Sequence, residues 1–363
     1  MSILIFIIIL AVLVFVHELG HFLVAKRAGV RVDEFGIGFP PALWKKKVGE
    51  TMYSINAFPI GGFVKIFGEN PDEESLNGVD ASRSLTSKSK IVQASVIVAG
   101  IVFNLVFAWF LVSSAYMIGV HASTDSEYGA RVASPALTII DILPKSPAEL
   151  AGLKIGDKIL NLKSGKDVLE NPNASSAQDF VASHKEVVLT YERGGIYSSV
   201  VVNPKEGIAT GRLAIGIAMD VVGNLQLPFY EAPYAGLKTT VSLTWDTATG
   251  LFDFFKQIFI GKANFSQVSG PVGIVGVVGS STELGFVTLL TLAALISINL
   301  AVINILPFPA LDGGRLFFIL VEKIKGSPIK PTVANAVNLA GFALLIILMI
   351  VVTYHDIAKI IYG

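Results

Sequence analysis

The stretch that decides the fold covers residues 3–25 and reads Ile3-Leu-Ile-Phe-Ile-Ile-Ile-Leu-Ala-Val-Leu-Val-Phe-Val-His17-Glu18-Leu-Gly-His21-Phe-Leu-Val-Ala25. A helix of about 20 apolar residues is long enough to cross the hydrocarbon core of a membrane. The stretch has no basic region before it and no small-residue cleavage site after it, so it differs from a secretory signal. We therefore predict a retained membrane helix that carries three ionisable side chains, those of His17, Glu18 and His21.

Four segments of the chain share this length and apolar character. They cover residues 3–25, 92–119, 286–306 and 335–354. The composition agrees, because 52% of the residues are hydrophobic and the mean hydropathy is +0.65, which is high for a soluble protein. The net charge of zero gives no basic field for nucleic acid, and the lack of cysteine excludes disulfides and thiolate metal sites. We predict a polytopic α-helical membrane protein with about four transmembrane helices, which contacts the lipid bilayer and no nucleic acid.

Basic residues predict the orientation of these helices. The loop between the first two segments contains Lys26, Arg27, Arg31, Lys45, Lys46, Lys47, Lys65, Arg83, Lys88 and Lys90. Because cytoplasmic loops are enriched in Lys and Arg, this loop is predicted to be cytoplasmic. If each segment crosses the membrane once, the loop after the third segment lies on the same side as this loop. It is also basic, with Arg315, Lys323, Lys325 and Lys330. The pattern is typical of a multi-pass protein of the inner (plasma) membrane.

The first cytoplasmic loop contains a β-like stretch, Met52–Phe67. Its two runs of alternating residues are separated by Pro59 and by Gly61-Gly62, which predicts a β-hairpin with an apolar face. Its low charge beside a membrane helix favours a hairpin that dips toward the bilayer, where protein or water must satisfy its backbone. An ordinary cytoplasmic β-domain is the alternative.

Residues 124–222 differ in kind, with short β-rich runs, polar turns and no segment long enough to span a membrane. They predict a folded extracytoplasmic domain. Its centre, Ser146–Leu160, resembles the PDZ signature, in which a short helix and a Gly-Asp turn precede a strand. PDZ domains take an extended peptide as an added strand or capture a C-terminal carboxylate, and a purely steric plug is the alternative. Residues 225–285 then alternate aromatic and polar side chains, as amphipathic helices on a membrane surface do.

The ionisable residues of the first helix have the spacing of a metal site. Residues four apart share one face of a helix, so His17 and His21 can bind one zinc ion. Glu18 lies beside that face and can act as a general base toward water that the metal activates. Charged groups at membrane depth cost roughly 2.5–3.5 kcal/mol each, which argues against a purely structural role. We therefore predict a Zn²⁺ site.

A catalytic zinc ion needs a third protein ligand. Glu34 and Asp33 lie beyond the cytoplasmic end of the first helix. His355 and Asp356 fall at the outer end of the fourth helix. Asp312 follows the third helix, where two prolines interrupt the helix and two glycines free the backbone. Like the two histidines it falls in the inner half of the bilayer, so it is the predicted third ligand.

These motifs together resemble the site-2 protease (M50) family of intramembrane metalloproteases, of the bacterial RseP type. The resemblance rests on His17-Glu-Leu-Gly-His21, on Asn299-x4-Asn304-x2-Pro-x-Pro-x-Leu-Asp312-Gly-Gly, and on the PDZ-like domain between them. It implies zinc-dependent hydrolysis of peptide bonds within the transmembrane segments of single-pass proteins, such as anti-sigma factors or signal-peptide remnants. The two histidines and the aspartate would hold zinc, and the glutamate would be the base. Many members carry two PDZ domains in tandem, whereas about 100 residues hold a single one here.

Three amides at membrane depth have a further predicted role. Asn104, Asn299 and Asn304 offer donors and acceptors to a substrate helix, which must unwind before it is cleaved. We predict that Asn104 and Asn299 hold the unwound strand and that the hairpin edge at Gly62-Phe63-Val64 pairs with it by strand addition. Amides that only join helices are the alternative.

Two other classes of protein fit part of the pattern. A zinc transporter or metal sensor would place polar residues along the whole depth of its helices, whereas here they gather at one level. An inactive PDZ-bearing scaffold is the second alternative, but the chain has the complete set of ligands and the base.

The motifs divide the chain into eight predicted parts. They are a transmembrane helix with the metal motif (1–28), a cytoplasmic loop with the β-hairpin (29–90), a second transmembrane helix (91–121), an extracytoplasmic PDZ domain (122–224), amphipathic surface helices (225–285), a third transmembrane helix ending in Leu-Asp-Gly-Gly (286–314), a cytoplasmic loop (315–334) and a fourth transmembrane helix (335–358). The metal site then lies toward the cytoplasmic side. The predicted partners are single-pass substrates, the bilayer, and a peptide or C-terminus at the PDZ domain.

Overall fold

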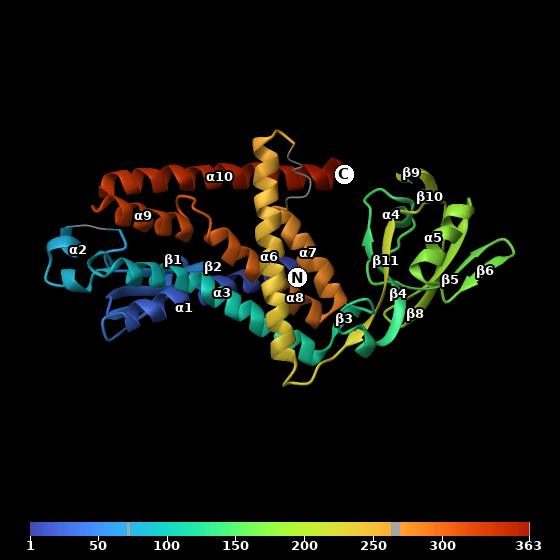
Figure 1. Cartoon of the computed structure of the whole chain (residues 1–363), viewed down its shortest axis with the longest axis horizontal. Helices are drawn as coiled ribbons and strands as arrows, with labels where there is room; N and C mark the ends of the chain where they lie inside the picture. The colour runs from blue at the N-terminus through green and yellow to red at the C-terminus, as the bar shows by residue number, and fades with distance from the viewer. Residues whose placement is uncertain (71–72, 263–268, 363) are drawn as a thin grey trace. The chain divides into compact units, whose positions relative to one another are not determined.

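The long apolar helices and the β-rich segment fall into two separate units in the computed structural model (Figure 1). The first, the helical unit, contains Met1–Ala115 and Tyr230–Lys359. The second, the β-rich unit, contains Tyr116–Phe229. The structure describes residues 1–70, 73–262 and 269–362.

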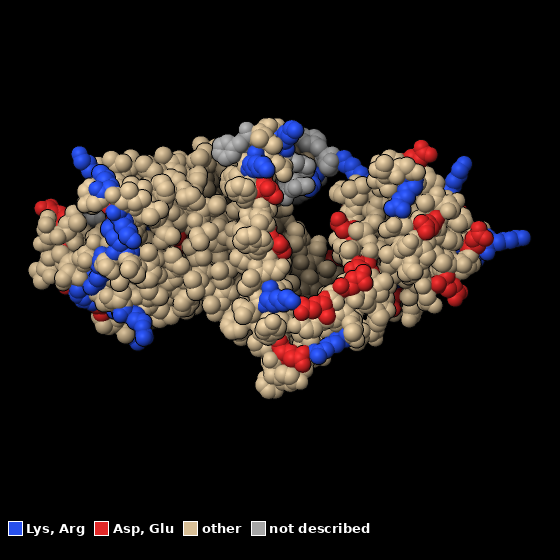
Figure 2. All heavy atoms as spheres, viewed as in Figure 1, with Lys and Arg blue, Asp and Glu red and all other residues tan. Residues whose placement is uncertain are grey.

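Four helices among the described residues are long and apolar enough to cross a membrane, as the sequence predicts. They are α1 (Ser2–Arg27), α3 (Lys90–Ile118), α8 (Phe286–Asn304) and α10 (Pro331–Tyr362). α1 ends in Lys26 and Arg27, where cations suit the negative end of the helix dipole. On the face drawn in Figure 2, the Lys and Arg side chains at one end of the helical unit gather around α2 (Glu73–Asn77), and the neighbouring helix surfaces carry few charges.

Besides the short α2, the described residues of the helical unit form three further α-helices. They are α6 (Ala232–Phe259), α7 (Pro271–Leu284) and α9 (Asp312–Lys325). The expectation for residues 225–285 is amphipathic surface helices, and residues 263–268 of that range lie outside the described residues. α7 departs from this expectation, because it is apolar and contacts both α1 and α8. Gly279 is a small residue at the contact with α1, since a Cβ there would lie 3.0 Å from Oγ of Ser2.

The predicted third transmembrane helix, residues 286–314, consists of two helices, α8 and α9, joined by a loop. Pro307 and Pro309 lie in this loop and prevent α8 from continuing. The first turn of α9 packs directly on the loop, since a Cβ on Gly313 would lie 2.1 Å from a loop carbonyl oxygen. This contact fixes the position of Asp312 at the start of α9.

A small sheet beside α1 differs from the predicted hairpin. Its strands are β1 (Val32–Val48) and β2 (Thr51–Ile66), which pair with each other across a short turn. The prediction of a hairpin within residues 52–67 is wrong, because residues 52–55 and 62–65 both pair with residues 34–37. The alternating pattern of residues 52–67 correctly predicts an extended chain but does not specify the strand with which it pairs. The partner strand, β1, is irregular around Gly36 and Gly38.

The β-rich unit is built on a seven-stranded sheet in the order β3-β11-β4-β5-β7-β8, with β6 paired to β5. Its strands are β3 (Val120–Ser123), β4 (Ala133–Ile142), β5 (Lys158–Ser164), β6 (Asp167–Glu170), β7 (Val187–Arg193), β8 (Ile196–Val202) and β11 (Ile217–Leu225). A second sheet is formed by β9 (Lys205–Ala209) and β10 (Arg212–Ala214). The α-helices of this unit are α4 (Pro147–Leu150) and α5 (Ala174–Ser183). The core between sheet and helices includes Ile139, Leu162 and Leu189, all buried. The PDZ identity of this unit stays a prediction.

One buried ion pair joins the turn before β5 to the end of β7. Asp157 is fully buried, and Arg193 donates hydrogen bonds of 2.6 Å to each of its carboxylate oxygens. The carboxylate holds the pKa of Arg193 above its usual range. Asp157 belongs to the Gly-Asp turn on which the PDZ resemblance rests, so this turn has a structural role.

Candidate metal centre

The two histidines of α1 lie one helical turn apart and both face α3. Their Nε2 atoms are 3.1 Å apart, and both side chains are buried. A glycine of α3 makes room for them, since a Cβ on Gly100 would lie 2.4 Å from Nε2 of His21 and 2.8 Å from Cε1 of His17. A larger residue at this position would displace both imidazoles.

The close approach of α1 and α3 depends on a second glycine. A Cβ on Gly20 would lie 2.5 Å from the backbone oxygen of Ala99. Small residues at a helix crossing let the two backbones touch. The crossing therefore lies between the two histidines and presses both rings against α3.

Asp312, the first residue of α9, meets the two histidines. Its Oδ2 is 3.0 Å from Nε2 of His17 and 3.3 Å from Nε2 of His21. Ligand atoms of a tetrahedral zinc ion, each about 2.0–2.1 Å from the metal, are about 3.3 Å from one another, so these atoms fit one ion. Within residues 1–70, 73–262 and 269–362 these three side chains form the one cluster with metal-ligand spacing.

The other acidic candidates, Asp33, Glu34 and Asp356, have different partners. Oδ1 of Asp33 accepts a 2.8 Å hydrogen bond from Arg31, and Glu34 lies 3.6 Å from Nζ of Lys45. Asp356 accepts hydrogen bonds from two backbone N–H groups at the start of α7. These contacts explain why the three aspartate and glutamate side chains are not part of the cluster.

Glu18 follows His17 on α1 and lies against β2. The backbone N–H of Val64 donates a hydrogen bond to its carboxylate, and a Cβ on Gly62 would lie 3.9 Å from its Cγ. Residues 62–65 pair with residues 34–37 of β1, while the N–H of Val64 is directed toward Glu18. The segment predicted for strand addition, which includes Phe63, therefore lies beside the predicted base.

The three predicted amides lie in different surroundings. Asn104 is completely buried on α3, and its Nδ2 is 3.3 Å from Nδ1 of His17. Asn299 and Asn304 are half-buried on α8. The sequence did not indicate that Ser297, also on α8, donates a 2.8 Å hydrogen bond to the backbone oxygen of Asn104. Asn104 thus has contacts on both sides inside the protein, whereas the other two amides retain exposed surface.

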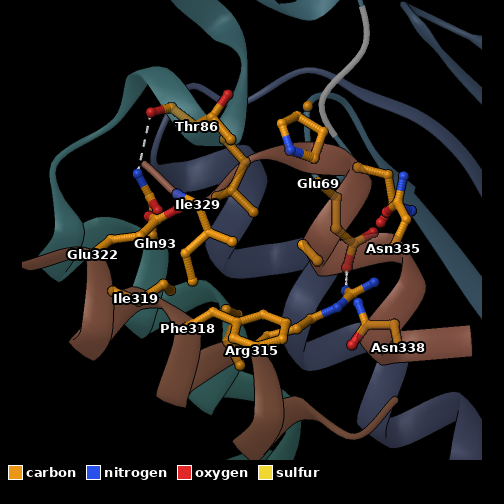
Figure 3. A pocket seen from close by; sticks show the side chains of 16 residues that line it. Glu69, Thr86, Gln93, Arg315, Phe318, Ile319, Glu322, Ile329, Asn335 and Asn338 are labelled. Atoms are coloured by element: carbon orange, nitrogen blue, oxygen red, sulfur yellow. Dashed lines mark hydrogen bonds and ion pairs between the residues drawn. The ribbon is translucent and has the colours of Figure 1, made fainter. Parts of the chain in front are cut away.

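A cavity of about 110 Å³, lined by both polar and apolar side chains, lies beside α9 (Figure 3). Arg315, one turn after Asp312, points into it and forms an ion pair with Glu69. Glu322 lies at the other side of the cavity and accepts a 2.5 Å hydrogen bond from Nζ of Lys90. Such a volume holds a few water molecules. The sequence offered one signal for this cavity, the charge directly after the Asp-Gly-Gly motif.

Comparisons with known proteins agree on one family. Residues 5–348 match Peptidase family M50. A protein of Clostridium perfringens that is named as a zinc metalloprotease is 37% identical over 351 residues, which cover 95% of each chain. The zinc metalloprotease RasP of Shouchella clausii is 32% identical over 431 residues, and that of Geobacillus kaustophilus 30% over 422 residues; both alignments cover at least 98% of each chain. The chain belongs to Peptidase family M50, the site-2 protease family, and is a zinc metalloprotease.

Proposed function

We propose that this protein hydrolyses peptide bonds within the transmembrane segments of single-pass membrane proteins, with His17, His21 and Asp312 as zinc ligands and Glu18 as general base. One observation carries the proposal. Three ligand atoms converge within 4.8 Å of one another, two of them on α1, which is long and apolar enough to span a membrane, and one at the start of α9. A zinc site at that depth has membrane-embedded peptide as its natural substrate.

The chemistry follows from the residues around the centre. Bound zinc supplies a Lewis acid that polarises the scissile carbonyl and activates water. Glu18 takes a proton from the attacking water and returns it to the leaving amide nitrogen, as a positioned carboxylate can. The hydrogen bond from the N–H of Val64 holds the carboxylate on the side of β2. Glu18 is thus oriented toward the side from which we propose that substrate approaches.

The substrate must present an extended backbone, because the carbonyls of an intact helix are hydrogen-bonded. We propose that residues 62–64 of β2 pair with this strand, and that Asn299 and Asn304 bind its freed amides. Support comes from residues 62–65, which among the described residues pair with β1 alone and lie beside Glu18, and from the half-buried positions of both amides. Substrates of the anti-sigma factor or signal-peptide-remnant type fit this proposal.

The proposed arrangement in the cell rests on charge. Lys and Arg gather in the segment between α1 and α3 and along and just after α9, which supports a multi-pass protein of the inner membrane with the metal centre toward the cytoplasm. The β-rich unit is then extracytoplasmic. Its Gly-Asp turn and sheet support a single PDZ domain that binds a peptide or a C-terminus.

The decisive variant is Glu18→Gln in the full chain, purified in detergent with a single-pass model substrate. We expect the zinc content to equal that of the wild type while the cleavage rate falls by at least about 100-fold, the contribution of a general base. Glu34→Gln is the matched control, because Glu34 lies on β1 and contacts Lys45 rather than the cluster. Cleavage by Glu18→Gln at the rate of Glu34→Gln would refute the role of Glu18.

A further inference from the structure

The second ring nitrogen of each histidine determines whether its Nε2 can bind a metal. Nδ1 of His21 lies 2.8 Å from the backbone oxygen of Val96, deep in the protein. A carbonyl oxygen only accepts hydrogen bonds, so this Nδ1 must carry the proton. Nε2 of His21 is therefore left with the free lone pair that a metal needs.

The corresponding ring nitrogen of His17, Nδ1, faces the side-chain amide of Asn104. This nitrogen lies 3.3 Å from Nδ2 of Asn104, while Oδ1 of that amide is buried and has no hydrogen-bond partner among the described residues. An amide N–H that donates to Nδ1 requires the imidazole to carry its own proton on Nε2. In this tautomer Nε2 has no free lone pair and cannot bind a metal. If the amide group is rotated by 180°, Oδ1 faces Nδ1 of His17 and can accept a hydrogen bond from Nδ1–H, which leaves Nε2 free for the metal. The amide nitrogen and oxygen have nearly the same shape, so both orientations fit the same space.

We propose that Asn104 is a positioning residue for the zinc site, whose side-chain oxygen accepts the Nδ1 proton of His17 and thereby sets its metal-binding tautomer. This inference rests on the proposed ligand set. It assigns Asn104 a different role from the predicted grip on substrate.

The surroundings of Asn104 fit a positioning role. The side chain is completely buried, so a substrate has no access to it. Ser297 of α8 holds its backbone oxygen, and Gly100, one turn earlier, lies under both imidazoles. Asn104 and Val96 therefore give each histidine an oxygen acceptor from the same helix, α3. Acceptors of this kind orient a metal-bound imidazole and typically change metal affinity by about 10–100-fold.

The test compares Asn104→Asp with Asn104→Leu in the full chain. Aspartate keeps the acceptor and removes the donor, whereas leucine removes both at similar volume. We expect zinc affinity, measured by competition with a chelator, to fall about 10–100-fold for Asn104→Leu and to stay within about threefold of wild type for Asn104→Asp. The visible spectrum of bound Co²⁺, which reports ligand geometry, should change for leucine alone, and KM should be unchanged in both.

The control is Ser113→Ala, which removes a buried polar contact to Trp109 elsewhere on α3 and should leave zinc affinity unchanged. Thermal unfolding of the zinc-free proteins separates misfolding from loss of the acceptor. Wild-type affinity in a folded Asn104→Leu protein, or an equal loss in a folded Asn104→Asp protein, would overturn the inference. A wild-type chain that binds zinc but cleaves no membrane substrate would refute the proposed function and leave this inference intact.

Discussion

α3 and α10 have similar length and hydropathy, but they are used in different ways. Half of the most apolar stretch of α3 is buried inside the protein, compared with 6% of that of α10. α3 places Gly100 and Asn104 against the histidines, whereas α10 exposes side chains such as Leu344 and Ile347. Hydropathy alone therefore finds both helices and does not distinguish them. The contacts that Gly100 and Asn104 make with the histidines show which helix surrounds the site.

Two parts of α10 contact other segments of the helical unit closely. Near its first half, a Cβ on Gly341 would lie 2.5 Å from Cβ of Pro309, in the loop between α8 and α9. Near its end, Asp356 accepts hydrogen bonds from the backbone N–H groups of Gly270 and Gly273. Between these places the helix is mostly exposed, so its effect on the metal centre should be indirect.

The largest effect should come from Gly100→Ala on α3. The added methyl would overlap Nε2 of His21 and push both rings away from their positions against α3. We expect zinc affinity to fall by at least about 100-fold, more than for loss of a single hydrogen-bond acceptor, and cleavage to fall with it. Metal content after dialysis and the cleavage rate are the measurements.

The control for this variant is Gly276→Ala on α7, a helix of the same bundle. Nothing lies within 4 Å of a Cβ at this position, so zinc content and cleavage should stay at wild-type values. Normal zinc binding by Gly100→Ala would show that the rings can move away from α3 without loss of the site.

A second comparison uses the same substitution on both helices. Leu111 of α3 is 7% exposed, whereas Leu344 of α10 is 53% exposed. Leu111→Ala leaves a cavity and should lower the free energy of unfolding by about 2–5 kcal/mol. Leu344→Ala shortens a side chain that is largely exposed and should change it by less than about 0.5 kcal/mol. Denaturant unfolding in mixed micelles measures both, and equal losses would mean that α10 has a partner surface.

The sequence predicted the parts of the site that depend on local spacing. His17 and His21 are four residues apart on one helix, and the number of membrane crossings predicts that Asp312 lies at their depth. These three side chains do converge. Their roles stay a prediction, as does the side of the membrane on which the β-rich unit lies.

The parts that the sequence did not indicate depend on contacts between distant segments. The partner of residues 62–65 is β1, some 30 residues earlier, and an alternating pattern does not encode that choice. Gly100 shows the same limit. A glycine in an apolar helix has several explanations, and its function becomes clear only when two imidazoles lie against it. Its spacing of four from Asn104 was the available signal, since both lie on one helix face.

The smallest effect should come from Asp356→Asn at the far end of α10. The carboxylate satisfies N–H groups that the first turn of α7 cannot pair internally, and its charge suits the positive end of that helix. Asparagine keeps one acceptor, so we expect a loss of about 1–2 kcal/mol in the free energy of unfolding, with zinc affinity unchanged. The control is Asp253→Asn on α6, an exposed carboxylate whose loss should have no effect. If Asp356→Asn lowered zinc affinity, the end of α10 would be coupled to the metal centre, and the division between a central α3 and a peripheral α10 would be wrong.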